Sequence, residues 1–324
     1  MKALRAVDVR GVWGTVLLPL SDGAIGGDIG GDIGGDIGGD IDWGRLAAQV
    51  DTLAASGVDG VYAHGTAGEF HAIDEAEFDR VNEVLATRCE AAGLPFQLGG
   101  SHPATPVMLG RVRRAAALEP GAVQVILPDW VPLNDDEVVR FLAGAAEAAG
   151  SVPLVLYNPP HAKTRVGPAL LARAAAATPS LIGVKMAGGD DDWYAAMAEL
   201  AGDLSIFVPG HLLATGLARG AHGSYSNVAA MSPRGAVAWY RMMTTDPEDA
   251  LDLEARLAEF FRRHIAPLQA AGLSNPALDK FLATVGGWAD IGTTLRWPAS
   301  SAPDDAVAPA RTDAHRLLPE LFPA

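Results

Sequence analysis

The sequence predicts a (β/α)8 barrel, a TIM barrel, with additional helices after it. Short apolar runs alternate with longer alanine- and leucine-rich segments of helical period as far as about residue 244. Eight strand–helix pairs follow one another in this region, and eight is the number that closes a parallel barrel. A doubly wound sheet is the alternative, but no glycine-rich nucleotide-binding turn follows the first strand, which favours the barrel.

The expected elements follow from where one pattern gives way to the other. Aliphatic and aromatic residues fill the strands, and the helices carry apolar residues three and four positions apart. The expected strands are 12–20, 60–64, 95–99, 122–127, 153–157, 181–185, 205–208 and 223–226. The expected helices of the barrel are 43–56, 74–92, 105–118, 135–149, 168–177, 191–201, 211–219 and 232–243.

The C-terminal region departs from the strand–helix alternation. We expect the barrel to occupy 1–244 and a helical extension to occupy 245–297, with helices at 248–270 and 277–284. The tail, 298–324, opens with a run rich in serine, proline and alanine, a composition that buries little apolar surface. We therefore expect the tail to be flexible.

One segment, 26–41, repeats the sequence Gly-Gly-Asp-Ile with a period of four. Paired glycines at this spacing make a helix or a strand costly. The regular aspartates resemble calcium-binding repeats, but those repeats have longer periods and more ligand oxygens in each turn. A flexible, repeat-expanded loop is the favoured interpretation. Because it follows the first strand, it would lie on the catalytic face of a barrel.

Composition excludes several classes of protein. The formal net charge of −15 opposes binding to nucleic acid and to anionic membrane surfaces. No apolar run approaches the length of a membrane span, and the first apolar stretch lacks the cleavage site of a signal peptide. Cys89 is the single cysteine, so there is no disulfide framework. We therefore expect a cytoplasmic protein with neither a nucleic-acid nor a membrane partner.

Lys185 is the strongest candidate for a catalytic residue. It ends the apolar run 181–185 in a chain that has only four lysines. Loss of hydration at the end of a buried strand lowers the pKa of an ammonium and frees the amine as a nucleophile, which can form a Schiff base with a carbonyl substrate. The alternative is a lysine whose side chain extends to solvent.

Other candidates stand at the ends of the expected strands, where the functional groups of such barrels gather. They are Thr66 and Ala67, Trp130, Tyr157, Gly210, and Tyr225 with Ser226. A core tyrosine is the alternative for Tyr157, but Asn-Pro-Pro after it indicates the start of a rigid loop. Four histidines near these positions lack the spacing of metal ligands, so no metal is expected; they are His64, His161, His211 and His222.

Four motifs in order resemble the dihydrodipicolinate synthase / N-acetylneuraminate lyase family. They are Gly-Thr-x-Gly-Glu at 65–69, Tyr-Asn-x-Pro at 157–160, Gly-x-Lys at 183–185 and Gly-x-x-Gly-x-x-Ser at 220–226. The resemblance extends from about Gly11 to Gly286. It implies a class I aldolase-like barrel, a homotetramer or homodimer, that acts on pyruvate or another 2-oxo acid without a metal or cofactor.

The resemblance also implies roles for individual residues. Lys185 would form the Schiff base, and Tyr157 would be the general acid and base. Thr66, with the backbone amides around Ala67, would hold the carboxylate of the 2-oxo acid. Glu69 would tie down this loop. Three further residues would line the opposite side of the pocket: Gly210, Tyr225 and Ser226.

Three departures from the family pattern bear on the substrate. Ala67 replaces a second hydroxyl, and Trp130 stands where the synthase branch carries tyrosines, one of which relays protons. Indole is a hydrogen-bond donor only, so Trp130 cannot relay a proton. The Arg-Thr pair that grips a second carboxylate in the synthases corresponds to Lys163-Thr164 only after a one-residue insertion. These changes argue against lysine biosynthesis.

The favoured function is therefore a lyase, an aldolase or hydro-lyase, acting on a 2-oxo acid such as pyruvate or a 4-hydroxy-2-oxo acid. The residues Pro-x-Trp at 128–130 resemble hydratase-aldolases that cleave arylidene pyruvates, where Trp130 would form a wall for an apolar or aromatic tail. The alternatives are a 2-oxo-3-deoxy sugar acid dehydratase, a dihydrodipicolinate synthase proper, and a barrel that binds a small molecule without catalysis.

Overall fold

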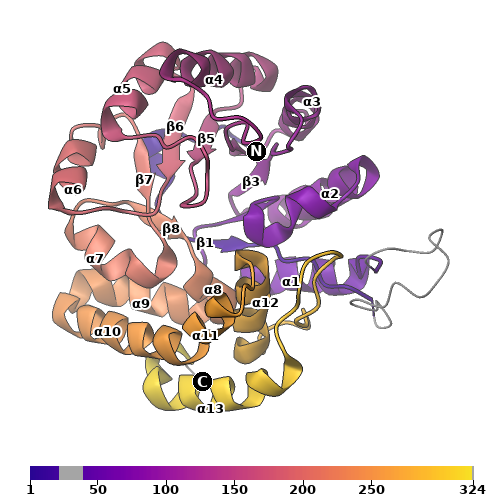
Figure 1. Cartoon of the computed structure of the whole chain (residues 1–324), viewed down its shortest axis with the longest axis vertical. Helices are drawn as coiled ribbons and strands as arrows, with labels where there is room; N and C mark the ends of the chain where they lie inside the picture. The colour runs from indigo at the N-terminus through magenta and orange to yellow at the C-terminus, as the bar shows by residue number, and fades with distance from the viewer. Residues whose placement is uncertain (22–38, 323–324) are drawn as a thin grey trace.

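The computed structural model describes residues 1–21 and 39–322 and shows a closed barrel of eight parallel strands in chain order (Figure 1). The strands are β1 Gly11–Thr15, β2 Gly60–Ala63, β3 Phe96–Gly99, β4 Ala122–Val125, β5 Leu154–Tyr157, β6 Leu181–Lys185, β7 Ser205–Phe207 and β8 Gly223–Tyr225. The helices around them are α1 Trp43–Ala55, α2 Glu75–Ala92, α3 Thr105–Ala116, α4 Asp135–Ala149, α5 Pro168–Ala177, α6 Asp191–Ala198, α7 Leu213–Ala218, α8 Asn227–Met231 and α9 Pro233–Thr245. The predicted (β/α)8 fold is confirmed.

Side-chain caps define where several helices begin. At the start of α2 the Glu77 amide donates to the Asp74 carboxylate at 2.8 Å, and the Asp74 amide donates to the Glu77 carboxylate at 3.0 Å. The same reciprocal pair, Asn134 and Glu137, starts α4. Such capping boxes satisfy amides that the first helical turn leaves free. They set the lengths of the loops that follow the strands, and these loops carry the candidate residues.

Side chains fill the inside of the barrel. Trp13, Tyr62, Val155, Phe207 and Tyr225 belong to one buried cluster there. The rings of Tyr62 and Tyr225 meet edge to face with centroids 4.6 Å apart. Aliphatic residues of the helices form a larger core around the strands. Because the interior is packed, a ligand has room only at the mouth of the barrel.

Strands β5 and β6 bring two of the predicted residues side by side. Tyr157 and Lys185 are register partners at the ends of these strands. The amide of Asn158 donates to the Lys185 carbonyl at 3.0 Å, which continues the pairing one residue further. Partners in a parallel pair project to the same face of the sheet. Tyr157 and Lys185 therefore point together into the barrel mouth.

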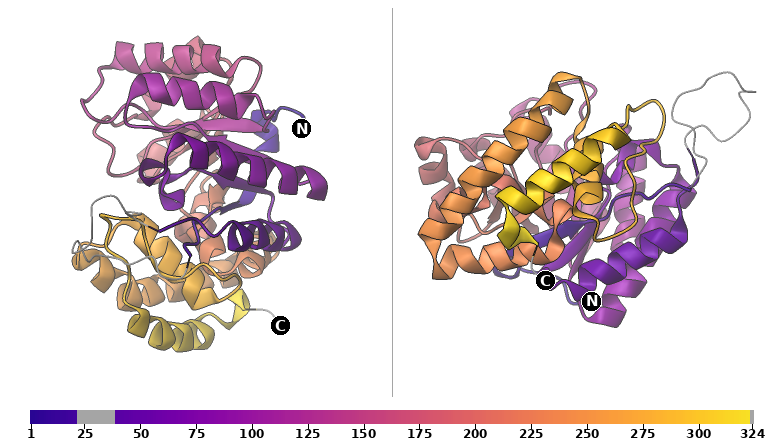
Figure 2. Two further views of the ribbon diagram at one scale, coloured as in Figure 1. Left: turned by 90° about the vertical axis from the view of Figure 1, so that its right-hand side faces the viewer. Right: turned by 90° about the horizontal axis from the view of Figure 1, so that it is seen from below.

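In the part of the chain that the structure describes, four α-helices follow the barrel and gather beside α8 and α9, as Figures 1 and 2 show. They are α10 Pro247–His264, α11 Ala266–Ala270, α12 Asn275–Gly286 and α13 Val307–Leu317. The single helix expected at 248–270 is broken between α10 and α11, because Pro267 has no amide hydrogen and its ring conflicts with the preceding helical turn. No described helix is both long and apolar enough to cross a membrane.

The tail differs from the expected flexible segment. Residues 307–317 form α13, which packs against α12 and α10. Ala310, Ala314, Leu318 and Leu321 are buried. Spaced three and four residues apart, they place one apolar stripe against the neighbouring helices. Two of its members are alanines, which are weak signals of a buried face, so the composition of the tail did not predict this stripe.

Residues 22–38 lie outside the described residues; they include 26–38, most of the Gly-Gly-Asp-Ile repeat at 26–41 that was predicted to lie on the catalytic face. The residues on either side are paired with each other. Leu20 forms an antiparallel bridge with Ile41, and the Ser21 amide donates to the Asp40 carbonyl at 2.9 Å. The segment therefore leaves and rejoins the described chain at one place.

Candidate active site

Lys185, the last residue of β6, holds its amine among three tyrosine rings. Its Nζ lies 4.4 Å from the ring centroid of Tyr157, 5.5 Å from that of Tyr225 and 5.7 Å from that of Tyr62. Among the described residues it makes no hydrogen bond, and no ion pair within 4.0 Å. Burial lowers the pKa of the ammonium to about 8, while the charge of Asp279 opposes this shift. The neutral, nucleophilic amine is therefore more accessible than in an ordinary lysine.

Tyr157 presents the phenol nearest to this amine. Burial raises its pKa to about 12, and a hydrogen bond with the Thr66 side chain acts in the opposite direction. The other two tyrosine hydroxyls have partners of their own. Tyr225 donates a hydrogen bond to Gln97 at 2.5 Å, and Tyr62 forms a hydrogen bond with the Thr15 side chain. Tyr157 thus connects the surroundings of the amine with the Thr66 side chain.

The turn Thr66–Gly68 follows β2 and is tied to α12. Glu69 ends it in the left-handed conformation, with a φ of 51°. Its carboxylate forms a buried ion pair with Lys280 at 2.7 Å and accepts the amide hydrogen of Arg296 at 3.0 Å. A buried carboxylate is stable only with such partners. Glu69 therefore makes the contacts of a residue that ties down the turn, as the resemblance implies.

These groups surround a cavity of about 570 Å³ at the C-terminal end of the barrel. The predicted residues on its wall are Thr66, Ala67, Tyr157, Lys185, Tyr225 and Ser226. The cavity continues toward the C-terminal helices, whose wall residues include the apolar Phe261, Ile265, Leu278 and Leu282 and the polar Arg262, Gln269 and Asn275. An apolar hollow with a few convergent polar groups is the usual form of a small-molecule site.

Gly210 lies beside this cavity but not on its wall. Its neighbours Pro209 and His211 are on the wall instead. A Cβ added to Gly210 would stand 2.4 Å from Ser226 Oγ. The glycine therefore allows the loop after β7 to approach β8 closely. Gly210 contributes to packing between these segments and does not line the cavity.

Trp130 also lies away from the cavity that contains Lys185, which corrects its predicted place as a wall of that pocket. Its side chain is 84% exposed and borders a second cavity of about 430 Å³, which shares Thr66 with the first. Lys163 holds it there, with Nζ 5.2 Å from the ring centroid and 3.0 Å from the Trp130 carbonyl oxygen. Strand β4 ends at Val125, so the loop carries Trp130 past the barrel mouth.

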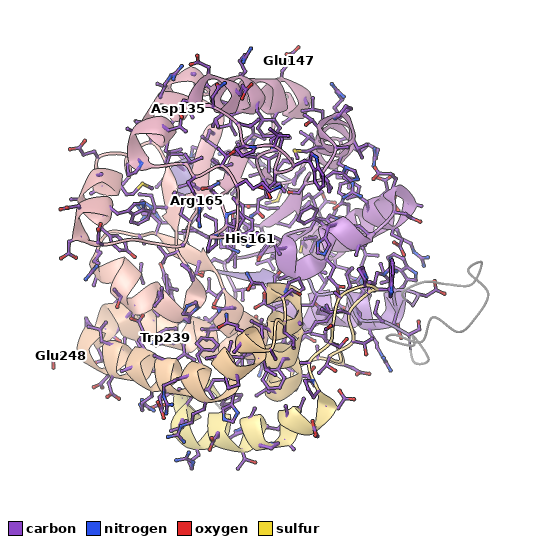
Figure 3. All side chains as sticks on the ribbon, viewed as in Figure 1. Asp135, Glu147, His161, Arg165, Trp239 and Glu248 are labelled. Atoms are coloured by element: carbon purple, nitrogen blue, oxygen red, sulfur yellow. The ribbon has the colours of Figure 1, made fainter. Side chains whose placement is uncertain are left out.

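The loop after β5 is braced by Asn158. Its side-chain amide donates to the Thr164 carbonyl at 2.8 Å, and its carbonyl accepts the Val166 amide at 3.1 Å. Figure 3 shows His161 and Arg165, both on this loop, in the central part of the view over the barrel. His161 borders the second cavity. The braced loop begins directly after Tyr157 and so supports its position.

Two residues on the cavity wall were not anticipated from the sequence. Tyr62 lies within β2, and a search confined to strand ends does not include it. Asp279 belongs to α12, outside the strand–helix alternation. A signal for Asp279 is present in the sequence: it and Lys280 are adjacent charged residues within the otherwise apolar run Ala277–Leu282. Charges inside such a run are costly unless they are paired or functional.

His211 is a third unanticipated group on this wall. Asn227 holds it at two points: the His211 amide donates to the Asn227 side-chain carbonyl at 3.1 Å, and the Asn227 amide nitrogen lies 2.9 Å from His211 Nδ1. Burial lowers the pKa of the imidazole, which favours the neutral ring. In that form Nδ1 accepts from Asn227 and Nε2 carries the hydrogen. His211 can then donate a hydrogen bond from Nε2 to a ligand.

Within the described residues, no three histidine, cysteine, aspartate or glutamate side chains are placed to hold a metal ion. The histidines of the sequence have other surroundings. His64 stacks on Phe78 with centroids 4.5 Å apart, and His222 Nδ1 accepts the Ile206 amide at 2.9 Å. Each of these two side chains is thus held by its own local contacts.

The chain is similar to known proteins over most of its length. A family model described as "Dihydrodipicolinate synthetase family" matches residues 36–307. The chain is 30% identical over 287 residues to a 4-hydroxy-tetrahydrodipicolinate synthase from Thermomicrobium roseum, covering 87% of this chain and 88% of that protein. It is 26% identical over 204 residues to a trans-2'-carboxybenzalpyruvate hydratase-aldolase from a Nocardioides species, covering 62% of this chain and 58% of that protein.

Solved structures share the fold. The wild-type sialic acid aldolase of Ruminococcus gnavus aligns with a TM-score of 0.80 at 18% identity, over 97% of this chain and 99% of that one. The 4-hydroxy-tetrahydrodipicolinate synthase of Methylacidiphilum fumariolicum gives the same TM-score of 0.80 at 21% identity, over 97% of both chains. At these identities the likeness establishes the barrel and its C-terminal helices.

Proposed function

This chain belongs to the dihydrodipicolinate synthetase family and is a lyase, and on that premise we propose that it acts on a 2-oxo acid through a Schiff base formed by Lys185. The resemblance inferred from its motifs is confirmed at the level of the family. The observation that carries the proposal is the amine of Lys185, which lies among three aromatic rings without a hydrogen-bond partner in the described chain. An unpaired, desolvated amine is the form of lysine that attacks carbonyls.

The proposed chemistry begins at the carbonyl carbon, C2. Nζ of Lys185 bonds to C2 while the π pair of the carbonyl moves to oxygen. Proton transfers through the Tyr157 phenol convert this oxygen first to a hydroxyl and then to a departing water, which leaves an iminium. The hydroxyl of Thr66 and the amides of its turn hold the substrate carboxylate. The iminium then draws electrons from a breaking bond on the adjacent carbon, C3, or between C3 and C4.

The outer part of the cavity supports a substrate with an apolar or aromatic tail. Phe261, Ile265 and Leu278 supply apolar side chains to this part of the wall, and Arg262, Gln269 and Asn275 supply polar ones. The apolar side chains suit the tail of a 4-hydroxy-2-oxo acid or an arylidene pyruvate, the substrates of a hydratase-aldolase, and the polar ones can bind an oxygen on that tail. One relative is named a trans-2'-carboxybenzalpyruvate hydratase-aldolase, and this similarity also favours a substrate with an aromatic tail. His211 would donate to an oxygen on such a tail.

We also propose that the protein works in the cytoplasm as a homodimer or homotetramer. Trp130 and Val131 are 84% and 64% exposed and adjacent, an apolar pair at the edge of the second cavity. Large exposed hydrophobic side chains next to each other mark protein contacts more often than isolated ones do.

Cys89 is free and buried, and burial raises the pKa of its thiol to about 12, so it remains an unreactive thiol.

Trapping of the imine tests the central proposal. The protein is incubated with pyruvate and borohydride, digested, and examined by mass spectrometry. The expected result is a stable adduct on Lys185 and none on Lys163, a matched lysine that lies beside the second cavity. Absence of an adduct with pyruvate and with every other small 2-oxo acid contradicts the proposal.

Turnover tests separate the substrate classes. Arylidene pyruvates and 4-hydroxy-2-oxo acids are expected to release pyruvate, detected by a coupled dehydrogenase. Sugar acids are expected to lose no water at a comparable rate. If Lys185→Ala retains the affinity for a ligand that the wild type does not convert, the barrel is a binding protein instead.

A further inference from the structure

Asp279 places a carboxylate on the wall of the cavity that contains Lys185. It is the only acidic residue on this wall within the described chain. Ala283, one helical turn further along α12, belongs to the same buried cluster as Ala67. Residues four apart in a helix share a face, so Asp279 lies on the side of α12 that meets the Thr66–Gly68 turn.

This carboxylate has no partner of its own. It makes no hydrogen bond with a described residue and no ion pair within 4.0 Å. Other acidic groups packed beneath the surface are paired: Glu69 with Lys280 at 2.7 Å, and Glu254 with the amide of Thr215 at 3.1 Å. An unpaired carboxylate in such surroundings is costly, and that cost is typical of a functional group rather than a structural one.

Asp279 and Lys185 line the same cavity. Burial raises the pKa of the Asp279 carboxyl to about 6, and the charge of Lys185 opposes the shift. Each group thus acts on the pKa of the other, although Nζ of Lys185 and the Asp279 carboxylate oxygens are more than 4.0 Å apart. A substrate carbon attached to Nζ of Lys185 would therefore lie in a cavity that the Asp279 carboxylate also lines.

The phenols near Lys185 are poorer bases. Burial raises the pKa of Tyr157 to about 12 and that of Tyr62 and Tyr225 further still. The Tyr225 hydroxyl is also committed to Gln97. A group that must accept a proton near neutral pH works best when its own pKa is close to that pH. Asp279 meets this condition, and the phenols do not.

We propose that Asp279 is the base that removes the proton from C3 of the substrate once Lys185 has formed the Schiff base, an inference that rests on the proposed function. The C3–H bond breaks and its electron pair becomes the C2–C3 double bond. The π pair of the iminium moves to nitrogen, which becomes neutral, and the proton goes to the Asp279 carboxylate. The reverse step returns the proton to C3. Tyr157 then transfers protons only to and from the oxygen atom that leaves C2 as water.

Two measurements on the intact protein separate imine formation from C3 deprotonation. Borohydride trapping with pyruvate reports the imine on Lys185. Proton NMR in deuterated water reports exchange of the methyl hydrogens of pyruvate, which requires the C3 step. For Asp279→Asn we expect trapping within about threefold of the wild type and exchange slower by roughly 10²–10⁴-fold, the usual contribution of a positioned base.

Controls distinguish a chemical role from a structural one. Asp203→Asn, at an exposed position, is expected to leave both measurements unchanged. Asp279→Glu retains a carboxylate and is expected to recover part of the exchange. When pyruvate saturates imine formation, so that the C3 step limits exchange, the wild-type exchange rate is expected to rise with pH through about 6 as the carboxylate ionises, and Asp279→Asn is expected to lose this limb. Three titratable groups face Asp279 from the barrel: Lys185, Tyr157 and Tyr62.

The outcomes are distinguishable. Trapping without loss of exchange in Asp279→Asn overturns the role of Asp279 and leaves the proposed function in place. Absence of trapping in the wild type overturns the proposed function itself. Should Asp279→Asn fail to fold, Asp279→Ser is measured in its place, and normal exchange in that variant overturns the proposal equally.

Discussion

Two lysines of this protein, one on a barrel strand and one on a C-terminal helix, differ in what surrounds them. Lys280, on α12, is completely buried, with its Nζ 2.7 Å from the Glu69 carboxylate and 2.6 Å from the Thr294 carbonyl oxygen. Lys185, on β6, keeps some accessible surface and lines the cavity. Its Nζ lies near three tyrosine rings and makes no hydrogen bond or ion pair with a described residue. Burial lowers the pKa of both ammonium groups. The more deeply buried lysine is the structural one, so the absence of a partner, rather than depth, marks the reactive amine.

The largest expected effect comes from removing the unpaired amine. Lys185→Met should reduce kcat/KM by on the order of 10⁵-fold, as loss of a nucleophile does. Its melting temperature should equal or exceed that of the wild type, because the replacement removes a charge that has no partner. Steady-state kinetics and thermal unfolding measure the two quantities. A stable variant that retains more than about a hundredth of the activity would place the nucleophile elsewhere.

Removing the paired amine of Lys280 should instead reduce the stability of the protein. Lys280→Met leaves the buried Glu69 carboxylate without its partner and should lower the free energy of unfolding by about 3–5 kcal/mol. The double variant Lys280→Met with Glu69→Gln should recover much of this loss, since no uncompensated charge remains. Urea unfolding monitored by circular dichroism measures both. If the single variant is as stable as the wild type, the ion pair does not hold the turn to α12.

The phenols around Lys185 sharpen the comparison next. Tyr157→Phe keeps the ring beside the amine but removes the proton carrier, and should slow imine formation by roughly 10²–10⁴-fold. Tyr225→Phe keeps its ring too and loses the hydrogen bonds of the hydroxyl with Gln97 and Gln124. It should slow the same step by less than about tenfold. Stopped-flow trapping measures the rates, and equal losses in the two variants would refute a special role for Tyr157.

The smallest expected effect is a displaced pH dependence. With the pKa of Lys185 lowered to about 8, the free amine declines as pH falls below that value. The rate of imine formation should therefore decrease about tenfold per pH unit below pH 8 and level off above it. An ordinary lysine, with a pKa of about 10.4, would give a rate that still rises at pH 10. Lys280 should give no adduct anywhere in this range.

Much of the fold was predictable because its pattern is local. Apolar strands and amphipathic helices alternate in the sequence itself, and caps such as Asp74 and Asn134 stand where the helices begin. The prediction failed at the tail, where the alanines of α13 form an apolar stripe only if the segment is already helical. It also failed at Pro267, which breaks the helix expected at 248–270 into α10 and α11.

The candidate site was predictable where strand ends define it. Tyr157 and Lys185 end adjacent strands, and parallel pairing places them together without further information. Trp130 was misplaced because a strand-end rule cannot tell how far a loop carries a side chain beyond the rim. Asp279 was missed because it reaches the cavity from α12, a helix outside the strand–helix alternation.

The sequence by itself determined the family, the barrel and the position of a lysine at the end of an apolar strand, because these depend on order and spacing along the chain. Only the tertiary structure decided which lysine lacks a partner and which carboxylate faces it. Partnership depends on distances between residues far apart in sequence, such as Glu69 and Lys280. Electrostatic energies depend on those distances and on burial, and neither is written in the local pattern.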